Sequence, residues 1–425
     1  MPSSPGSDVS TGYTDLCRHS GVPRQIVAAS LSRMTQPLLT LPLLVGVQER
    51  YHNHALAAVA VGLYTAGFAA MMPMTGRLVD RHGGRAILRI WLMLALIAVL
   101  GTSAALTMAV PTPVLLSVVT ILGMCLPPVG VVTRAGWPLL IPRAQLGTAY
   151  ALDTVINEAA TITGPLLAAL TLSILPAPLA LLTAFLPITV GSLGLPAAVL
   201  DRARQATRRP ARGPQSRRVI LTYGITFCAS LGAGSLVATA GRLATEAEEP
   251  GIAGVLLAAA AIGAVAAGTI AGRHHLPADA LTSRLIGFSA AITAAFIALT
   301  IGLPARGQSR GGVANIVTLA VLYLVLGSLT GPRDALLQLS IVLAARPAQR
   351  STSFSWLGTC GLLGFGFGSA VSGLVGNTLG QHLLPAAIAA GVALALSGSM
   401  PRPNASKPQP PASDTKSPRR RRRTR

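Results

Sequence analysis

Long apolar runs alternate with short polar segments along almost the whole of this chain. Most of these runs approach or exceed the roughly 20 residues that an α-helix needs to cross a hydrocarbon core of about 30 Å. The pattern predicts twelve membrane-spanning helices. Their expected ranges are 25–47, 55–75, 86–110, 114–133, 151–175, 179–200, 219–240, 252–271, 285–303, 313–342, 354–375 and 383–396.

Composition supports an all-α integral membrane protein. Hydrophobic residues make up 51% of the chain and charged residues 11%, whereas soluble domains are roughly one-quarter charged. Residues 201–218 are rich in Pro, Gly and Arg, and we expect a cytoplasmic linker there between two six-helix bundles, 24–200 and 219–400. Residues 1–23 and 401–425 are polar, and we expect disordered cytoplasmic tails.

The 34 Lys and Arg residues fall mainly on one side of the twelve spans when the N-terminus is placed inside. The positive-inside rule therefore predicts that both termini are cytoplasmic, in a plasma membrane protein. The basic stretches 202–218 and 419–425 account for much of the formal charge of +21. No aromatic residues interleave with their arginines, so we expect contact with anionic lipid headgroups rather than nucleic acid.

The loop between the second and third runs, residues 76–85, reads GRLVDRHGGR. It resembles the loop signature of major facilitator superfamily transporters, G-x-L-a-D-R-x-G-r-k, and it lies where that family carries the signature. Gly76, Asp80, Arg81, Gly83 and Arg85 match. The resemblance implies twelve helices in two six-helix bundles and secondary active transport by alternating access.

The charges of this loop predict a gate between the two halves. Asp80 can accept hydrogen bonds from backbone amides at the start of a neighbouring helix, and residues 351–353 offer such a start. Arg81 and Arg85 can pair with carboxylates at helix ends, and Asp153 is the nearest candidate by depth. The alternative is a simple topology signal, but such a signal needs neither the aspartate nor the glycines.

Ionisable residues within the spans predict a buried polar centre, because each costs at least about 2.5 to 3.5 kcal/mol in a bilayer. The candidates are Arg33, Arg134, Asp153, Asn157, Glu158, Arg333 and Asp334. Glu158 and Arg33 lie at similar depth, about 10 to 12 Å into parallel spans, so we expect them to pair. Asp153 has a second interpretation, as a carboxylate that interacts with the dipole of its own helix.

Residues 160–169 resemble the antiporter motif that exporters of the superfamily carry in their fifth helix. Gly164 and Pro165 match, whereas alanine replaces the other glycines. The alternative is a closely packed helix kinked at proline. The arginine that proton-coupled exporters carry in their fourth helix would lie at Val119 and is absent. Arg134 comes later in the same run, at a depth that suggests an interfacial or loop-anchoring role.

These observations favour a monomeric transporter that exports a small amphipathic or drug-like compound and uses an ion gradient as its energy source. Transport of a polar metabolite such as a sugar is the nearest alternative, although few hydrogen-bonding side chains are available for it. A membrane sensor or scaffold is the alternative from another class, but it would not need charges at depth. We expect no enzyme, cofactor or metal site, because no nucleophile, nucleotide-binding or Cys/His ligand pattern occurs.

Overall fold

The computed structural model describes residues 12–201, 215–246, 249, 251–273, 280–302, 313–375 and 379–401. Within these residues the chain forms α- and 3-10 helices and no strand, which confirms the expected fold class. The predicted linker falls outside the described residues at 202–214, as do the predicted tails at 1–11 and 402–425.

The first group of helices covers the N-terminal half. Its long helices match the first, second, third and fifth predicted spans, whereas the fourth span is divided into two helices and the sixth into three. Its helices are α2 (Val22–Tyr51), α3 (His54–His82), α4 (Gly84–Met108), α5 (Thr112–Met124), α6 (Val129–Leu140), α7 (Leu146–Ile174), α8 (Ala177–Thr183), α9 (Phe185–Gly194) and α10 (Ala197–Leu200).

The second group covers the C-terminal half and has six long helices among the residues that the structure describes. A 3-10 helix, η4 (Pro347–Gln349), precedes the fifth of them. The long helices are α12 (Arg217–Glu246), α13 (Gly251–Arg273), α14 (Leu281–Gly302), α15 (Val313–Ala344), α16 (Arg350–Leu374) and α17 (Leu379–Gly398).

Eleven helical segments in the described chain are long and apolar enough to cross a membrane. The helix α2 is not one of these eleven, although it is 30 residues long and packs between α7 and α9. Polar side chains along it, including Arg33 and Gln36, explain its lower hydropathy. Counting α2 as a span restores the predicted twelve.

The fourth span is interrupted between α5 and α6. Pro127 and Pro128 occupy the break, and a proline within a helix removes a backbone donor and clashes with the preceding turn. The helix therefore ends at Met124, and α6 begins anew at Val129. Its face carries Arg134 and Trp137 toward α7.

Matching glycines mark the same helix crossings in both halves. Gly123 of α5 lies against the backbone of α3 at Tyr64, and Gly327 of α15 lies against the backbone of α13 at Ala260. Gly164 of α7 packs on Pro37 of α2, and Gly368 of α16 packs on the α12 backbone. The two halves are therefore structural repeats in the same order, as in transporters built from parallel repeats.

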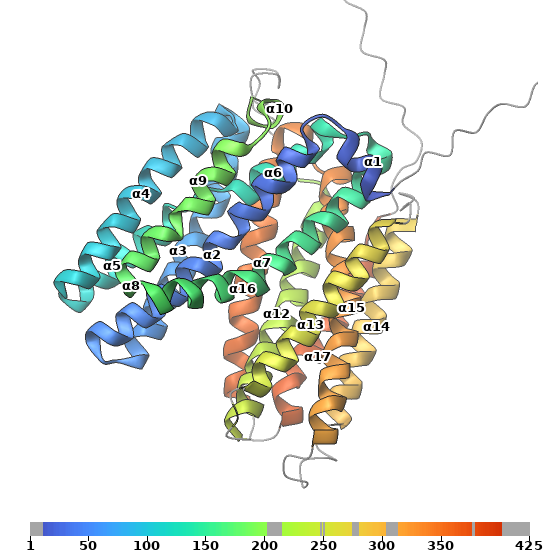
Figure 1. The fold of residues 1–425 in the computed structure, drawn as a ribbon. Coiled ribbons are helices and arrows are strands. Elements are labelled where there is room, and N and C mark those ends of the chain that lie inside the picture. The colour runs from blue at the N-terminus through green and yellow to red at the C-terminus, as the bar shows by residue number, and fades with distance from the viewer. Residues whose placement is uncertain are drawn as a thin grey trace, which may run out of the picture.

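The two groups share a hydrophobic core at one end of the molecule only. One buried cluster combines residues of both groups, among them Leu16, Trp137, Ile225, Leu336 and Phe354. Three further clusters of the described residues each belong to a single group: those around Tyr64 and Trp91 to the first group, and that around Tyr323 to the second. Figure 1 shows the groups joined where α1 (Tyr13–Arg18), α6 and α10 lie and diverging toward the opposite end. We call the joined end the closed end.

The prediction of a disordered tail over residues 1–23 is wrong for the residues from Tyr13 onward. Residues Tyr13–Arg18 form a short helix, α1, and α2 begins at Val22. Leu16 is fully buried in the shared core, and the Tyr13 hydroxyl lies 3.1 Å from the carbonyl oxygen of Thr269 on α13. Polar composition did not reveal this segment, because tertiary contacts rather than its own sequence stabilise so short a helix.

Candidate functional site

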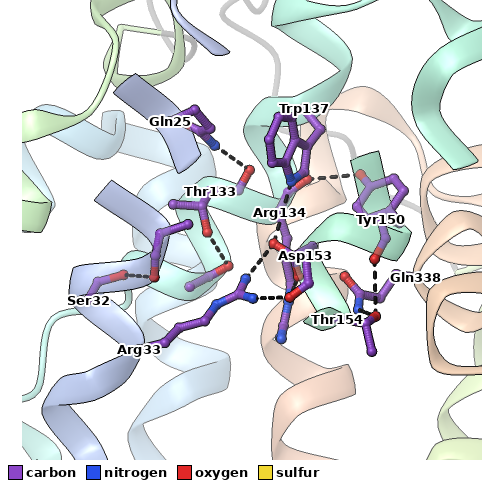
Figure 2. Close-up of polar contacts among 12 residues, drawn as sticks. Gln25, Ser32, Arg33, Thr133, Arg134, Trp137, Tyr150, Asp153, Thr154 and Gln338 are labelled. Carbon is purple, nitrogen blue, oxygen red and sulfur yellow. Dashed lines mark hydrogen bonds and ion pairs between the residues drawn. The ribbon is translucent and has the colours of Figure 1, made fainter. Parts of the chain in front are cut away.

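Asp153 of α7 is the centre of a buried charge cluster near the closed end. Its carboxylate is fully buried and accepts from the guanidinium of Arg33 on α2, which also contacts the Asp153 backbone carbonyl. Arg134 of α6 donates to the other carboxylate oxygen at 3.0 Å. Figure 2 shows the two arginines approaching Asp153 from separate helices. We call Arg33, Asp153 and Arg134 the charge cluster.

Neighbouring side chains fix the position of this cluster. The Trp137 indole N–H points to Asp153 at 3.4 Å, and the Tyr150 hydroxyl donates to the backbone carbonyl of Arg134 at 2.9 Å. One turn after Tyr150, Thr154 accepts a hydrogen bond of 3.2 Å from Gln338 of α15. The charge cluster thus belongs to the N-terminal half. The hydrogen bond from Gln338 to Thr154 connects the same part of α7 to the C-terminal half (Figure 2).

The charge cluster holds two cationic groups and one anionic group, and the Nε of Arg33 is buried without a hydrogen-bond partner. Removing one partner of a buried ion pair is strongly destabilising, because the remaining charge is left without compensation. The cluster therefore links α2, α6 and α7 firmly. Asp153 lies two turns into α7, beyond the first turn in which a helix dipole acts, so the dipole interpretation of this residue is wrong.

The expected pairing of Arg33 with Glu158 is also wrong, because Arg33 pairs with Asp153. The prediction rested on depth alone. Five residues along an α-helix turn the side chain by about 140°, so Asp153 and Glu158 point to different neighbours. Arg134 was expected to anchor a loop at the interface, and its side chain instead keeps only 19% of its surface exposed within the cluster.

Glu158 points toward the C-terminal half. Its carboxyl group lies beside Asn157 and interacts with the like charge of Asp334 on α15. No ion pair within the described chain includes Glu158. Arg333 is buried and pairs with the half-exposed Asp334 at 2.9 Å. Two carboxylates from opposite halves, Glu158 and Asp334, therefore interact where α7 meets α15.

The signature loop joins the two halves as the sequence predicted. Asp80, near the end of α3, accepts from the backbone N–H groups of Ser351 and Thr352 at 3.1 and 2.7 Å. The Thr352 hydroxyl adds a third hydrogen bond at 2.8 Å. Asp80 thus caps the start of α16 from another helix. Its negative charge also interacts favourably with the positive end of the α16 dipole.

The glycines of this loop allow the close approach. A Cβ on Gly76 would collide with Ser355 of α16, so only glycine lets α3 cross α16 at this distance. Gly83 connects α3 to α4 with φ of 91°, a conformation that favours glycine.

The arginines of the loop do not reach Asp153, contrary to expectation. Arg85 forms a bidentate ion pair with Asp201 at 3.0 and 2.9 Å, within the N-terminal half, and Arg81 is exposed. The carboxylate of Asp153 is already occupied by the charge cluster.

The element at Gly164 and Pro165 lies where α7 crosses α2. A Cβ on Gly164 would meet Pro37 at 2.5 Å, so the glycine permits close helix packing. This geometry fits the packing interpretation and leaves a directional role as a proposal.

Sequence reasoning did not identify the aromatic and amide partners of the site. Trp137 and Tyr150 fall between the fourth and fifth expected spans, and Gln338 lies inside the tenth, so none of them belongs to a periodic polar pattern. Among the described residues, no group of three or more His, Cys, Asp or Glu side chains could hold a metal ion.

Comparisons with known proteins agree with this geometry. A sequence profile described as Major Facilitator Superfamily matches residues 26–304. A search of curated proteins by sequence finds no match.

Solved structures resemble the fold over almost its whole length. A bacterial homologue of the iron transporter ferroportin, in an outward-facing state, is 14% identical with a TM-score of 0.66, covering 89% of this chain and 98% of that chain. FucP in its outward conformation is 14% identical with a TM-score of 0.67, covering 89% and 99%. The human organic anion transporter MFSD10 is 17% identical with a TM-score of 0.61, covering 88% and 98%.

Proposed function

This chain belongs to the Major Facilitator Superfamily of membrane transporters, and on that premise we propose that it exports a small amphipathic or drug-like compound by alternating access. The observation that carries the proposal is the Asp80 contact with the start of α16, because it joins the two halves by hydrogen bonds that can break and re-form. Polar contacts of this kind suit a gate better than a permanent junction.

The distribution of buried residues supports two alternating states. The halves share a core at the closed end, while the clusters around Tyr64 and Tyr323 remain within their own halves. Separating the closed end and joining the opposite end would expose the centre to the other side of the membrane. Both halves can then move largely as rigid bodies around the charge cluster and the facing Glu158 and Asp334.

Export, rather than uptake, is supported by the partial antiporter-like element at Gly164 and Pro165. The energy source in this proposal is an ion gradient. Glu158 and Asp334 are the proposed coupling candidates, because they face one another between the halves. The resemblance to FucP and to the ferroportin homologue supports the fold alone.

The proposed arrangement places the closed end, both termini and the basic linker in the cytoplasm of a plasma membrane protein. The proposed bundles are residues 24–200 and 219–400, and a single copy of the chain would be sufficient for transport. The basic linker and tail would contact anionic lipid headgroups.

Transport in proteoliposomes tests this function. The purified chain would be reconstituted with a panel of labelled amphipathic cations, amphipathic anions and sugars, with and without an imposed pH gradient. We expect gradient-dependent movement of an amphipathic compound. Accumulation of a sugar instead would favour the polar-metabolite alternative, and a correctly folded protein that moves no compound would favour a sensor or scaffold.

A further inference from the structure

A cavity of about 140 Å³ lies in the C-terminal half at the closed end. The start of α12, the end of α15, η4 and the start of α16 surround it. Its polar lining includes Gln215, Ser216, Arg346, Gln349 and Ser353. Helix ends at this level lie at the boundary of the bilayer, so the cavity opens near lipid headgroups. It shares no lining residue with the charge cluster.

One buried hydroxyl on the cavity lining, that of Ser353, has no hydrogen-bond partner, and the Tyr223 hydroxyl lies next to it. Ser353 is fully buried and lines the cavity, and the Tyr223 hydroxyl lies beside the Ser353 and Gln215 side chains. Neither hydroxyl oxygen has a partner in hydrogen-bonding geometry. Buried hydroxyl groups normally find a partner, because desolvation without a hydrogen bond is unfavourable. The two hydroxyls therefore point to an occupant that accepts hydrogen bonds.

The charged side chains in the two stretches that form the cavity, residues 215–223 and 344–353, are all positive. Arg346 lines the cavity and is exposed, while Arg217, Arg218 and Arg350 lie in the adjoining helix starts. Residues 215–223 and 344–353 contain no Asp or Glu. The carboxylate of Asp80, from the other half, is engaged by the α16 backbone. An acceptor that enters this cavity is thus favoured when it is anionic.

We propose that this cavity binds a phosphate group, supplied by an anionic lipid of the leaflet at the closed end. Serine and tyrosine hydroxyls, an amide and an arginine are the donors that phosphate oxygens accept from. The volume is about that of four to five liquid waters, at about 30 Å³ each, which leaves room for a tetrahedral headgroup. Ser353 directly follows Thr352, so the bound phosphate would hold the start of α16 in place behind the Asp80 contact.

The test measures lipid retention and thermal stability of the purified full-length chain. Native mass spectrometry would count phosphatidylglycerol molecules that remain bound after transfer from mixed phosphatidylcholine and phosphatidylglycerol nanodiscs. Thermal unfolding in micelles would be followed with added phosphatidylglycerol, phosphatidylcholine or inorganic phosphate. The variants are Arg346→Gln and Ser353→Val, with Arg217→Gln as the matched control, because Arg217 is exposed in the same basic region but does not line the cavity.

We expect one phosphatidylglycerol to be retained saturably, with affinity about tenfold weaker in Arg346→Gln and little changed in Arg217→Gln. Equal weakening by both arginine variants would overturn the site, since diffuse surface charge would then explain the binding. Absence of saturable binding to the wild-type chain would overturn it as well. Saturable stabilisation by inorganic phosphate alone, lost in Arg346→Gln, would support the phosphate site but replace lipid with a soluble source.

Discussion

Asp153 is shared by two arginines while its side chain is wholly removed from solvent, so the stability of the N-terminal half is expected to depend on this carboxylate. Asp153→Asn would leave Arg33 and Arg134 without their counter-charge. We expect a loss of roughly 3 to 5 kcal/mol in the free energy of unfolding, which thermal unfolding of the purified protein would detect.

Glu158→Gln is the matched control, because it makes the same chemical change on the same helix at a residue in none of the described ion pairs. We expect little change in stability. In double mutants, Arg33→Met should be additive with Glu158→Gln and strongly non-additive with Asp153→Asn. Equal destabilisation by Asp153→Asn and Glu158→Gln would contradict the assignment of the charge cluster.

We expect Asp80 to act on the equilibrium between states rather than on folding. Asp80→Asn removes the charge and leaves one acceptor for the amides of Ser351 and Thr352. The weakened contact should cost about 1 to 2 kcal/mol and shift the closed end toward opening by roughly tenfold. Substrate binding should survive while transport falls, as measured in proteoliposomes at equal protein content.

Asp201→Asn is the corresponding control for this gate. Asp201 pairs with Arg85 at the same end, but both residues belong to one half and are partly exposed. An exposed pair contributes little, so transport should stay close to wild type. Wild-type transport in Asp80→Asn would show that the loop is a topology signal only.

At the scale of elements, the apolar runs predicted the long helices because a bilayer imposes one length on every span. The break between α5 and α6 lies at Pro127 and Pro128. The sequence contains both prolines, but hydropathy alone does not mark a break there, because the run stays apolar across them. The helix α1 was missed because Leu16 and Tyr13 are stabilised by distant residues. Arg33 pairs with Asp153 rather than with Glu158. Side-chain packing sets how α2 and α7 are rotated about their own axes, and hydropathy does not predict this rotation.

The short helix α1 connects the two halves at the closed end. It continues into α2 of the N-terminal half, while the Tyr13 hydroxyl contacts the carbonyls of Gly268 and Thr269 on α13. Burial raises the pKa of Tyr13, so the hydroxyl keeps its proton and can donate. Tyr13→Phe should loosen α1, which hydrogen exchange of its backbone amides would register as faster exchange.

Arg18→Gln serves as the control on the same helix, because Arg18 is exposed and pairs only with Asp15, three residues before it. Gly272→Ala should reproduce the effect of Tyr13→Phe from the other side, since a Cβ at Gly272 would collide with the tyrosine ring. Unchanged exchange in both Tyr13→Phe and Gly272→Ala would show that α1 does not depend on this contact.

At the scale of the whole molecule, the orientation in the membrane can be tested at two positions. A single cysteine replacing Gln215, before α12, should resist an impermeant maleimide in intact cells and react in inside-out vesicles. A cysteine replacing the exposed Arg50, at the opposite end of α2, should show the reverse pattern. Labelling at position 215 in intact cells would overturn the proposed topology.

The core shared by the two halves also determines how the chain could be divided. Leu336 and Phe354 of one half pack in a single cluster with Trp137 and Tyr150 of the other, so the association does not rest on the covalent connection between Asp201 and Gln215. Two fragments, cut between residues 204 and 205 and produced together in one cell, should assemble into a complex that co-purifies. The chain would then behave as a heterodimer whose subunits happen to be translated as one polypeptide.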